Sequence, residues 1–419
     1  MPWKETVPVE QRMRFVLECQ DAQLSMAVLC RKYGVSRRIG YKWWQRYQAE
    51  GIQGLTDRSR APRTHPQAVP DEIESAILAA RGKHPIWGPK KLLTWLQGKQ
   101  PSFCWPARST MAEILDRHGL TVPRKRRRRV EPQEQPFADC QEPNSTWCAD
   151  FKGWFRTGDG QRCDPLTITD AFSRYLLRCQ RTRKTDGLTV RALFEAAFRE
   201  YGLPRTIRTD NGAPFASRAI GGLSALSVWW LKLGIAHERI EPGQPQQNGR
   251  HERMHLTLKN ETASPPAATL RRQQQRFDAF RREFNEDRPH EALGMATPGS
   301  VYAASARAYP ERLLELTYPS DWLVRRVCDR GELRWQGSKV FVTRVLDGEL
   351  VGLEAMDERY WRLWLGPRAL GVLDGRRQRL LTRRELHQAG WWELLLGRAF
   401  RCAAGPAQEP LNVLPMSPD

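Results

Sequence analysis

A change of hydrophobic pattern near residue 143 constrains the fold of this chain more than any other feature. Residues 124–129 are six consecutive Lys or Arg side chains, and a stretch rich in Pro, Gln and Glu follows them to Pro143. Before this break, apolar residues recur at helical spacing, whereas after it short strand-like and helix-like segments alternate. Because a block of like charge repels itself and stays extended, we expect a linker between all-α modules and an α/β domain.

The charge balance points to a polyanionic partner. The 419-residue chain carries 67 Lys and Arg residues against 47 Asp and Glu residues, for a formal net charge of +20. The first 135 residues hold +12 of this excess. Such a distribution is typical of a protein that binds nucleic acid. A merely basic, soluble surface is the alternative explanation.

The same sequence argues against a secreted or membrane protein. No apolar stretch approaches the roughly 20 residues of a membrane span, and the first residues show no apolar leader segment. The nine cysteines are odd in number and include no C-x-x-C pair, so we expect reduced thiols and no zinc finger. These features predict a cytoplasmic protein without membrane contact.

The N-terminal periodicity predicts three helices, over residues 10–20, 25–33 and 36–47. Gly34 suits the end of the second helix, and Ser36 suits the cap of the third. Two helices joined by a short turn that contains Gly form a helix-turn-helix. The residues expected to contact DNA are Arg37, Arg38, Tyr41 and Lys42. An ordinary three-helix bundle is the alternative.

A second set of helices is expected over residues 71–83, 88–97 and 107–118, in an order that favours a second helix-turn-helix. The polar segment 56–70 before it is expected to be a linker that follows DNA. The basic run is interpreted as a DNA-contacting tether, through Arg126, Arg127, Arg128 and Arg129. For that run, a simple solvated linker is the alternative.

Residues after 143 predict three successive strands and then alternating helices and strands, which favours an α/β domain with a mixed sheet. Three acidic residues fall at the end of a strand or the beginning of a helix, namely Asp150, Asp210 and Glu252. A charged residue inside an apolar strand is costly unless it is paired or binds a metal. Clustered carboxylates supply the hard oxygen ligands that two Mg²⁺ ions need.

Short strand-like runs return near residue 320. They lie at residues 324–327, 339–342, 350–354 and 362–365. This spacing predicts a small β-barrel. The last residues, 379–419, carry no pattern that we interpret.

The residues around Asp150, the triplet Asp210-Asn211-Gly212 and the segment 245–259 resemble the catalytic core of DDE transposases and retroviral-type integrases. Further segments are similar to one bacterial insertion-sequence branch and occur in its order, at residues 33–36, 54–59, 84–88 and 288–293. The resemblance covers roughly residues 1–375. It implies a ribonuclease-H-like core with Asp150, Asp210 and Glu252 as the metal-binding triad. It also implies Mg²⁺ or Mn²⁺ as cofactor, two ions per site, and DNA-end hydrolysis followed by strand transfer.

One departure from this family concerns the third carboxylate. Asp210 and Glu252 are separated by 41 residues, several more than is commonest, and we place the surplus at residues 219–230. Glu238 and Glu241 are nearer alternatives, but both flank a strand, whereas the family places its Glu on the helix. His255 and Lys259 follow Glu252 on the same helical face. We expect both to contact DNA, with a solvated helix face as the alternative.

Two other classes of protein remain as alternatives. Residues 251–255 read H-E-x-x-H, the signature of zinc metalloproteases. That motif is short, however, and its helix also carries Arg250, Arg253 and Lys259, which suits a phosphate-facing surface better than a buried zinc site. A protease would also leave the two aspartates unexplained. The other alternative is a non-catalytic DNA-binding regulator or an inactivated transposase, although all three carboxylates are present.

These inferences together predict a multidomain bacterial transposase that binds the terminal inverted repeats of a mobile element and joins them to target DNA. It would act in the cytoplasm, associated with the nucleoid, as a homo-oligomer of at least two copies on double-stranded DNA. The expected domains are a helix-turn-helix (1–60), a second helix-turn-helix-like module (61–123), a basic linker (124–143), a ribonuclease-H-like integrase core (144–305), a small β-barrel (320–378) and an uninterpreted tail (379–419).

Overall fold

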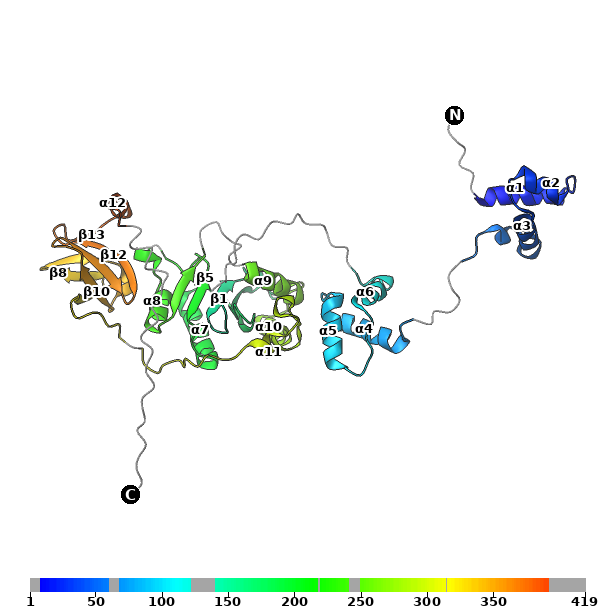
Figure 1. Ribbon diagram of the computed structural model, residues 1–419. Coiled ribbons are helices and arrows are strands. Elements are labelled where there is room, and N and C mark those ends of the chain that lie inside the picture. Colours follow the sequence, from blue (N-terminus) through cyan, green and yellow to red (C-terminus); the bar gives the residue numbers. More distant parts are fainter. Residues whose placement is uncertain are drawn as a thin grey trace, which may run out of the picture. The chain divides into compact units, whose positions relative to one another are not determined.

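The computed structural model describes residues 8–59, 68–121, 140–217, 219–240, 249–313 and 315–391 (Figure 1). These residues form two compact units, 1–70 and 71–419, and each unit is described by itself. The basic run with Arg126 to Arg129 lies outside the described residues, as does the Pro- and Gln-rich segment 241–248. Among the described residues, none of the helices combines the length and the apolar character needed to cross a bilayer.

The N-terminal unit contains the three predicted helices. They are α1 (Pro8–Gln20), α2 (Met26–Lys32) and α3 (Arg37–Glu50), and a 3₁₀ turn η1 (Gly51–Leu55) follows. Gly34 has φ +64° after α2, which an L side chain rarely adopts, and the Ser36 hydroxyl accepts the Ile39 N–H at 3.3 Å. A Cβ at Gly40 would lie 2.5 Å from Cys30 Sγ, so glycine allows α3 to approach α2 closely. The helix-turn-helix geometry is therefore encoded locally.

The second unit begins with three further helices, α4 (Asp71–Lys83), α5 (Pro89–Lys99) and α6 (Arg108–Arg117). Their boundaries match the expected second set within two residues, and their buried side chains include Ile77, Leu92 and Met111. The loop between α4 and α5 is fixed by two stacked rings, His84 and Trp87, whose centroids are 3.8 Å apart. Burial on one face of each helix accounts for this small core.

Side chains of this three-helix module also contact the segment that follows α10. His84 Nδ1 lies 3.1 Å from the Glu283 carboxylate, and Lys99 Nζ lies 3.0 Å from Asp287. The Arg288 guanidinium lies 5.7 Å from the centroid of the Trp87 ring. Charged pairs and one cation–π contact therefore connect the module to the core.

The core is built on the mixed sheet that the sequence predicts. Its strands are β1 (Thr146–Phe151), β2 (Phe155–Arg156), β3 (Arg162–Asp170), β4 (Leu176–Thr182), β5 (Thr206–Thr209) and β6 (Ala236–Arg239). Strand β3 pairs antiparallel with β1, β2 and β4, whereas β1–β5 and β5–β6 are parallel. The sheet therefore combines antiparallel and parallel neighbours in the order β2-β3-β1-β5-β6, with β4 beside β3.

Helices pack against this sheet as two hydrophobic clusters. Helices α7 (Gly187–Tyr201) and α8 (Ala225–Lys232) bury Phe194, Phe198 and Trp230 against Leu166 and Ile168 of β3. Helices α9 (Gly249–Thr262) and α10 (Leu270–Arg282) form the other cluster with Cys163 and Leu176. Because side chains alternate along a strand, Thr167 and Thr169 of β3 face opposite to Leu166 and Ile168, and they contact α9.

The segment after α10 closes the core. Residues 270–287 form α10 and a π-helical turn, η4 (Glu283–Asp287), and are followed by η5 (Glu291–Leu293) and α11 (Pro298–Val301). Asn285 of that turn accepts the Leu176 N–H at 2.8 Å and donates to the Leu176 carbonyl at 3.1 Å. This pair of bonds ties the turn to β4.

The C-terminal strands form a curled, open sheet, so the expectation of a small β-barrel is wrong in its closure. The sheet has the order β13-β12-β11-β10-β7 and its neighbours are antiparallel. Its strands are β7 (Leu323–Arg326), β10 (Leu350–Ala355), β11 (Tyr360–Leu365), β12 (Arg368–Asp374) and β13 (Arg379–Leu380). Strands β8 (Glu332–Trp335) and β9 (Ser338–Phe341) pair with each other instead of joining the edges. Closing a barrel requires its two edge strands to pair, and among the described residues β7 and β13 do not.

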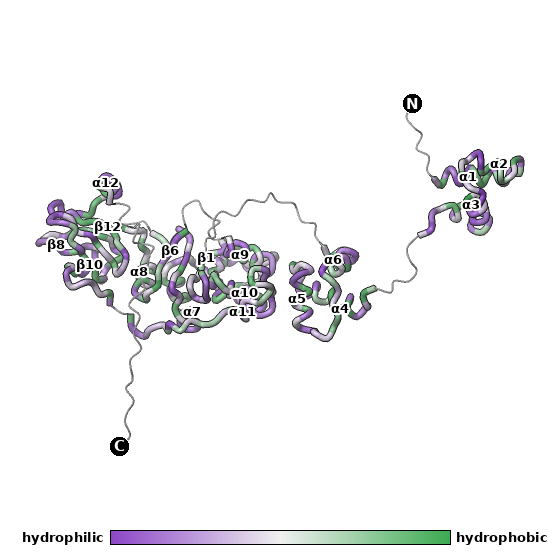
Figure 2. Tube along the Cα trace, in the orientation of Figure 1, coloured by the Kyte–Doolittle hydropathy of each residue, from purple (hydrophilic) through white to green (hydrophobic). Residues whose placement is uncertain are grey.

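The open sheet packs on the segment where the surplus residues were placed. Leu223 and Val228, next to and within α8, belong to the same buried cluster as Val351, Leu363 and Leu373 of the sheet. Lys232 Nζ also pairs with the Glu349 carboxylate at 2.9 Å. Figure 2 shows hydrophobic residues, in green, along the backbone of both layers. A short helix, α12 (Arg383–Gln388), follows β13 within the region that carried no interpretation, and residues 392–419 lie outside the described residues.

Candidate active site

Strand register explains the positions of two of the three predicted carboxylates. Asp150 lies near the end of β1, and Asp210 directly follows β5. These strands are parallel, and Ala149 pairs with Thr209. Each aspartate is therefore one residue beyond the same pair, on strands about 4.8 Å apart. The sheet brings Asp150 and Asp210 together at one edge.

The turn after β5 holds Asp210 in place. The Gly212 N–H donates to Asp210 Oδ1 at 3.1 Å, and the Asn211 amide donates to the Ile240 carbonyl at 2.7 Å. The triplet therefore fixes the aspartate through its own side chains and backbone, as an Asx-type turn does. This turn explains why Asp210, Asn211 and Gly212 are consecutive in the sequence.

Glu252 approaches the site from helix α9. The helix buries His251, Met254, His255 and Leu258, while Glu252 is exposed. Burial, and after it the negative charges of Asp210 and Glu252, raise the pKa of Asp150 to about 7. The charges of Asp210 and Glu252 therefore act on Asp150, and a divalent cation bound to Asp150 would offset their repulsion.

The structure adds two histidines to this site. Thr167 pairs with Asp150 across β1 and β3, and its hydroxyl lies 2.6 Å from His251 Nε2 and 2.7 Å from His255 Nε2. His251 Nδ1 lies 3.1 Å from the Thr169 hydroxyl. His255 Nδ1 lies 3.8 Å from Asp150 Oδ2. One ligand atom from each of Asp150, His251 and His255 lies within 4.8 Å of the others.

Both histidines are neutral at pH 7. Burial lowers the pKa of His251 to about 3. Burial, reinforced by His251 and Lys152, lowers the pKa of His255 to about 2. A neutral imidazole keeps one nitrogen lone pair, which is the form that binds metal ions.

The placement of His255 differs from the sequence expectation. Its side chain is only 5% exposed and faces β3, so it does not share the exposed face of Glu252 and Lys259 as expected. The reason is that His251, Met254, His255 and Leu258 recur at helical spacing and together form the sheet-facing side of α9. From the sequence, we expect α9 to face phosphate and not to form a buried site. That expectation is wrong for His251 and His255, which are both buried. Lys259 is exposed and remains a predicted DNA contact.

Other acidic residues of the core have partners in the fold. Glu238 on β6, one alternative to Glu252, forms an ion pair with Arg208 at 2.9 Å. Glu241, the other alternative, lies outside the described residues. Asp164 pairs with Arg162 at 2.6 Å. Asp170 accepts the Asn144 N–H at 2.8 Å and the Ser173 hydroxyl at 2.6 Å. These contacts account for three of the acids within the sheet.

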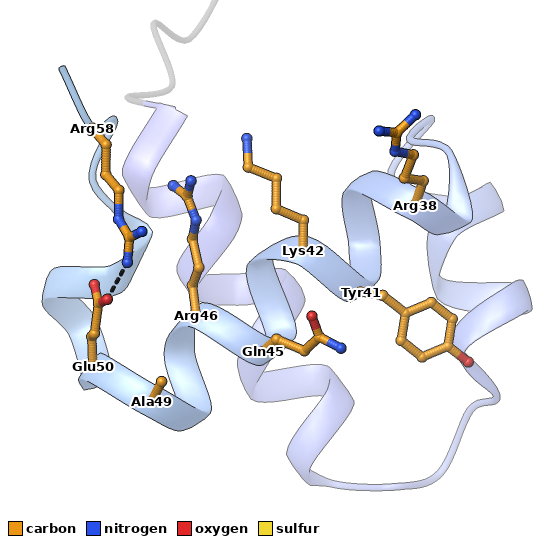
Figure 3. Close-up of a pocket in the computed structure, with 8 residues that line it drawn as sticks. All are labelled: Arg38, Tyr41, Lys42, Gln45, Arg46, Ala49, Glu50 and Arg58. Atoms are coloured by element: carbon orange, nitrogen blue, oxygen red, sulfur yellow. Dashed lines mark hydrogen bonds and ion pairs between the residues drawn. The ribbon is translucent and has the colours of Figure 1, made fainter. Parts of the chain in front are cut away.

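Helix α3 presents a basic surface in the N-terminal unit (Figure 3). A groove along it is lined by Arg38, Tyr41, Lys42, Gln45, Arg46, Ala49, Glu50 and Arg58. Trp43 is buried in the core of this unit, and Arg37 is exposed at the start of the helix. The sequence prediction named Arg38, Tyr41 and Lys42 but omitted Gln45 and Arg46 from its contact set. Their i+4 spacing from Tyr41 and Lys42 is the signal that predicts them.

Comparison with known protein families defines the class of this fold. Two models described as integrase core domain match residues 141–245 and 233–298. A helix-turn-helix domain matches residues 11–63, and a homeodomain-like domain matches residues 39–115. The chain thus combines helix-turn-helix DNA-binding domains with an integrase core.

Similar proteins are encoded by bacterial insertion elements. An uncharacterized 31.7 kDa protein of insertion element IS407 from Burkholderia multivorans is 32% identical over 192 residues, 45% of this chain and 66% of that protein. An uncharacterized 39.2 kDa protein of insertion element IS476 from Xanthomonas euvesicatoria is 33% identical over 187 residues, 44% of this chain and 52% of that protein. The match covers less than two thirds of either relative. It confirms the resemblance to the insertion-sequence branch with an integrase-like core.

Solved structures align with part of this chain at low identity. The catalytic core domain of HTLV-2 integrase, in complex with magnesium, is 18% identical and aligns with a TM-score of 0.31. The alignment covers 39% of this chain and 99% of that one.

Proposed function

We propose that this chain is a transposase that binds the terminal inverted repeats of a mobile DNA element, hydrolyses phosphodiester bonds at its ends and transfers the ends to target DNA. The observation that carries the proposal is the meeting of Asp150 and Asp210 on adjacent parallel strands, in a chain that also contains helix-turn-helix domains. Glu252 on α9 completes the set through its effect on the pKa of Asp150.

The three carboxylates are the residues that would hold two divalent ions, Mg²⁺ or Mn²⁺. Their oxygens are the hard ligands that these ions prefer. Burial raises the pKa of Asp150 most, and the negative charges of Asp210 and Glu252, which a cation would offset, add to it. When bound, two such ions activate a water or a 3′-hydroxyl and stabilise the leaving oxygen. The strand register and the Asp210 turn orient the aspartates before any substrate arrives. Lys259, exposed on α9, would hold a DNA phosphate beside them.

The modules divide the work of end recognition, chemistry and assembly. Residues 1–60 and 61–123 would recognise the terminal repeats, through Arg37, Arg38, Tyr41 and Lys42 in the first. Residues 124–143, with Arg126 to Arg129, would hold the DNA backbone between modules. Residues 144–305 would perform the chemistry, and the open sheet within 320–378 would support assembly. Two DNA ends must be joined in one reaction, so the proposal includes a homo-oligomer on DNA.

The test is nicking of a DNA duplex that carries the inverted repeats flanking the gene. We expect Mg²⁺-dependent nicking by the wild-type protein and its loss in Asp210→Asn and Glu252→Gln. Glu195→Gln, an exposed acid on α7 that pairs with Arg199, is the matched control and should nick normally. Unchanged nicking by either triad variant would reject the triad assignment.

Binding of the same duplex distinguishes the alternative of a non-catalytic regulator. That alternative predicts tight, specific binding of the repeats by the wild-type protein and no nicking with Mg²⁺ or Mn²⁺. The proposal predicts both activities, with binding retained in Asp210→Asn. Protease activity would instead require Glu252 and the two histidines but not Asp210.

A further inference from the structure

The two buried histidines are more than the proposed triad needs. A site made only of carboxylates requires no imidazole, yet α9 places His251 and His255 against Thr167, directly opposite Asp150. Both rings are buried, at 3% and 5% exposure. Burying a polar ring costs free energy unless its nitrogens find partners, so the question is which partner each nitrogen has.

Three of the four ring nitrogens have hydroxyl partners. His251 uses Nδ1 with Thr169 and Nε2 with Thr167, and His255 uses Nε2 with Thr167. The remaining atom, His255 Nδ1, faces Asp150 Oδ2 at 3.8 Å. This separation is too long for a hydrogen bond. It leaves room for a bridging atom between the nitrogen and the carboxylate oxygen.

Counting protons indicates what this nitrogen carries. The Thr167 hydroxyl has one proton but lies within hydrogen-bonding distance of both Nε2 atoms, so at least one ring must donate to it. The Thr167 hydroxyl also lies 3.2 Å from the Asp150 carbonyl oxygen, to which it donates its proton. Both rings then donate their Nε2–H to Thr167, and the Thr169 hydroxyl donates to His251 Nδ1. In that arrangement His255 Nδ1 is an unprotonated lone pair aimed at the Asp150 carboxylate.

We propose that Asp150 Oδ2 and His255 Nδ1 together bind one borderline transition-metal ion, of the class of Mn²⁺, Co²⁺ or Zn²⁺. Two lone pairs face each other here, and a cation between them converts their repulsion into two bonds. An imidazole ligand favours these ions over Mg²⁺, which prefers oxygen. Thr167 and His251 orient the His255 ring by fixing its Nε2–H.

This inference shares Asp150 with the proposed triad but concerns metal binding alone, so it is tested without DNA. The full-length protein is loaded with Mn²⁺, and pulsed electron paramagnetic resonance detects nitrogen-14 coordinated directly to the ion. We expect a nitrogen-14 coupling in the wild-type protein and its loss in His255→Ala. The affinity for Mn²⁺ should fall about tenfold or more in this variant, while the affinity for Mg²⁺ should change much less.

The control is His118→Asn. His118 forms another pair with a carboxylate, Glu74, at 2.8 Å, but this pair is exposed, so its loss should leave the coupling intact. Circular dichroism establishes that each variant is folded. Absence of nitrogen-14 coupling in the folded wild-type protein, or its persistence in folded His255→Ala, would overturn the inference. If the coupling is present but no nicking occurs, the proposed function fails while the metal site stands.

Discussion

At the residue scale, Asp150 is where opposing requirements meet. It lies in an interior strand because β1 must pair with both β3 and β5, yet its chemistry requires a charge. Burial and two neighbouring carboxylates raise its pKa to about 7. A proton and a metal ion therefore compete for the same oxygens.

This competition predicts a pH-dependent affinity for Mg²⁺. Because the pKa of Asp150 is raised to about 7, about half of the molecules hold a proton there at pH 7. Binding should strengthen as the pH rises from 6 to 8, level off above that, and release a proton near pH 7. Titration calorimetry in two buffers of different ionisation enthalpy measures this proton release. Asp150→Asn should bind weakly and without this dependence, and a flat wild-type affinity would contradict the prediction.

The buried histidine His251 predicts sensitivity to acid. Its folded-state pKa is lowered to about 3 by burial, below the unfolded value near 6.5, so the unfolded chain binds the proton preferentially. Neutral His251 contributes its full stabilisation above about pH 6.5. This contribution to the free energy of unfolding falls by up to about 1.4 kcal/mol per pH unit as the pH falls toward 3. His251→Gln should therefore lose less Tm than the wild-type protein between pH 7 and pH 5, as followed by thermal unfolding. Asp150, whose pKa is raised, favours the folded state as the pH falls, and it does so equally in the wild-type protein and in His251→Gln. Equal losses of Tm in the two proteins would therefore show that His251 is not the source of the acid sensitivity.

At the element scale, α3 is the helix through which we propose that the N-terminal unit contacts DNA. Its buried Trp43 is surrounded by the cations of Arg12, Lys42 and Arg46, 3.9, 4.6 and 5.2 Å from the ring centroid. One face of the helix therefore packs and the other presents positive charge. The charged groups of these side chains lie within cation–π distance of the ring.

Neutralising this face should weaken DNA binding in a salt-dependent manner. For Lys42→Gln and Arg46→Gln in the full-length protein, we expect lower affinity and a salt slope that falls by about 1 for each lost phosphate contact. Fluorescence anisotropy with a labelled duplex at several salt concentrations measures both. Lys32→Gln is the control, since Lys32 is already paired with Glu18 at 2.6 Å. An equal effect of the control would indicate a general loss of charge and not a contact surface.

At the scale of the whole molecule, the integrase core and the C-terminal sheet share one buried cluster within the second unit. Leu223 is fully buried and joins Val228 in contact with the sheet. The same segment explains the long spacing between Asp210 and Glu252, since residues near α8 serve both the core and the sheet. Its length is a consequence of this packing and has no direct role at the carboxylates.

Removing part of that shared cluster should destabilise both layers. Leu223→Ala leaves a cavity, and we expect a loss of about 2–5 kcal/mol of stability, with faster proteolysis within residues 323–380. Differential scanning calorimetry and limited proteolysis measure the two effects. Leu188→Ala removes a side chain that is 82% exposed, so it should change stability by less than about 0.5 kcal/mol. Similar changes in stability for Leu223→Ala and Leu188→Ala would show that the shared cluster does not stabilise the two layers.

The sequence predicted those parts of the fold that depend on local pattern. Helical periodicity, Gly34 and Ser36 set the first three helices, and the strand–turn signal around Asp210 placed the aspartate at the end of β5. These features are encoded by neighbouring residues, because caps, turns and amphipathic faces act over a few positions. Asp150 and Asp210 could be paired from the sequence only with the help of the family resemblance.

Tertiary structure decided what depends on register and on distant contacts. Whether the C-terminal strands close a barrel depends on the pairing of β7 with β13, which local pattern does not encode, and the sheet stays open. The side of α9 that faces the sheet was misjudged at His255, because His251 and His255 become buried only when α9 packs on Thr167 and Thr169. The sequence alone determined the modules and the acidic residues of the site. Only the packing of α9 on β3 brought two histidines to Asp150, since burial is a property of the assembled layers.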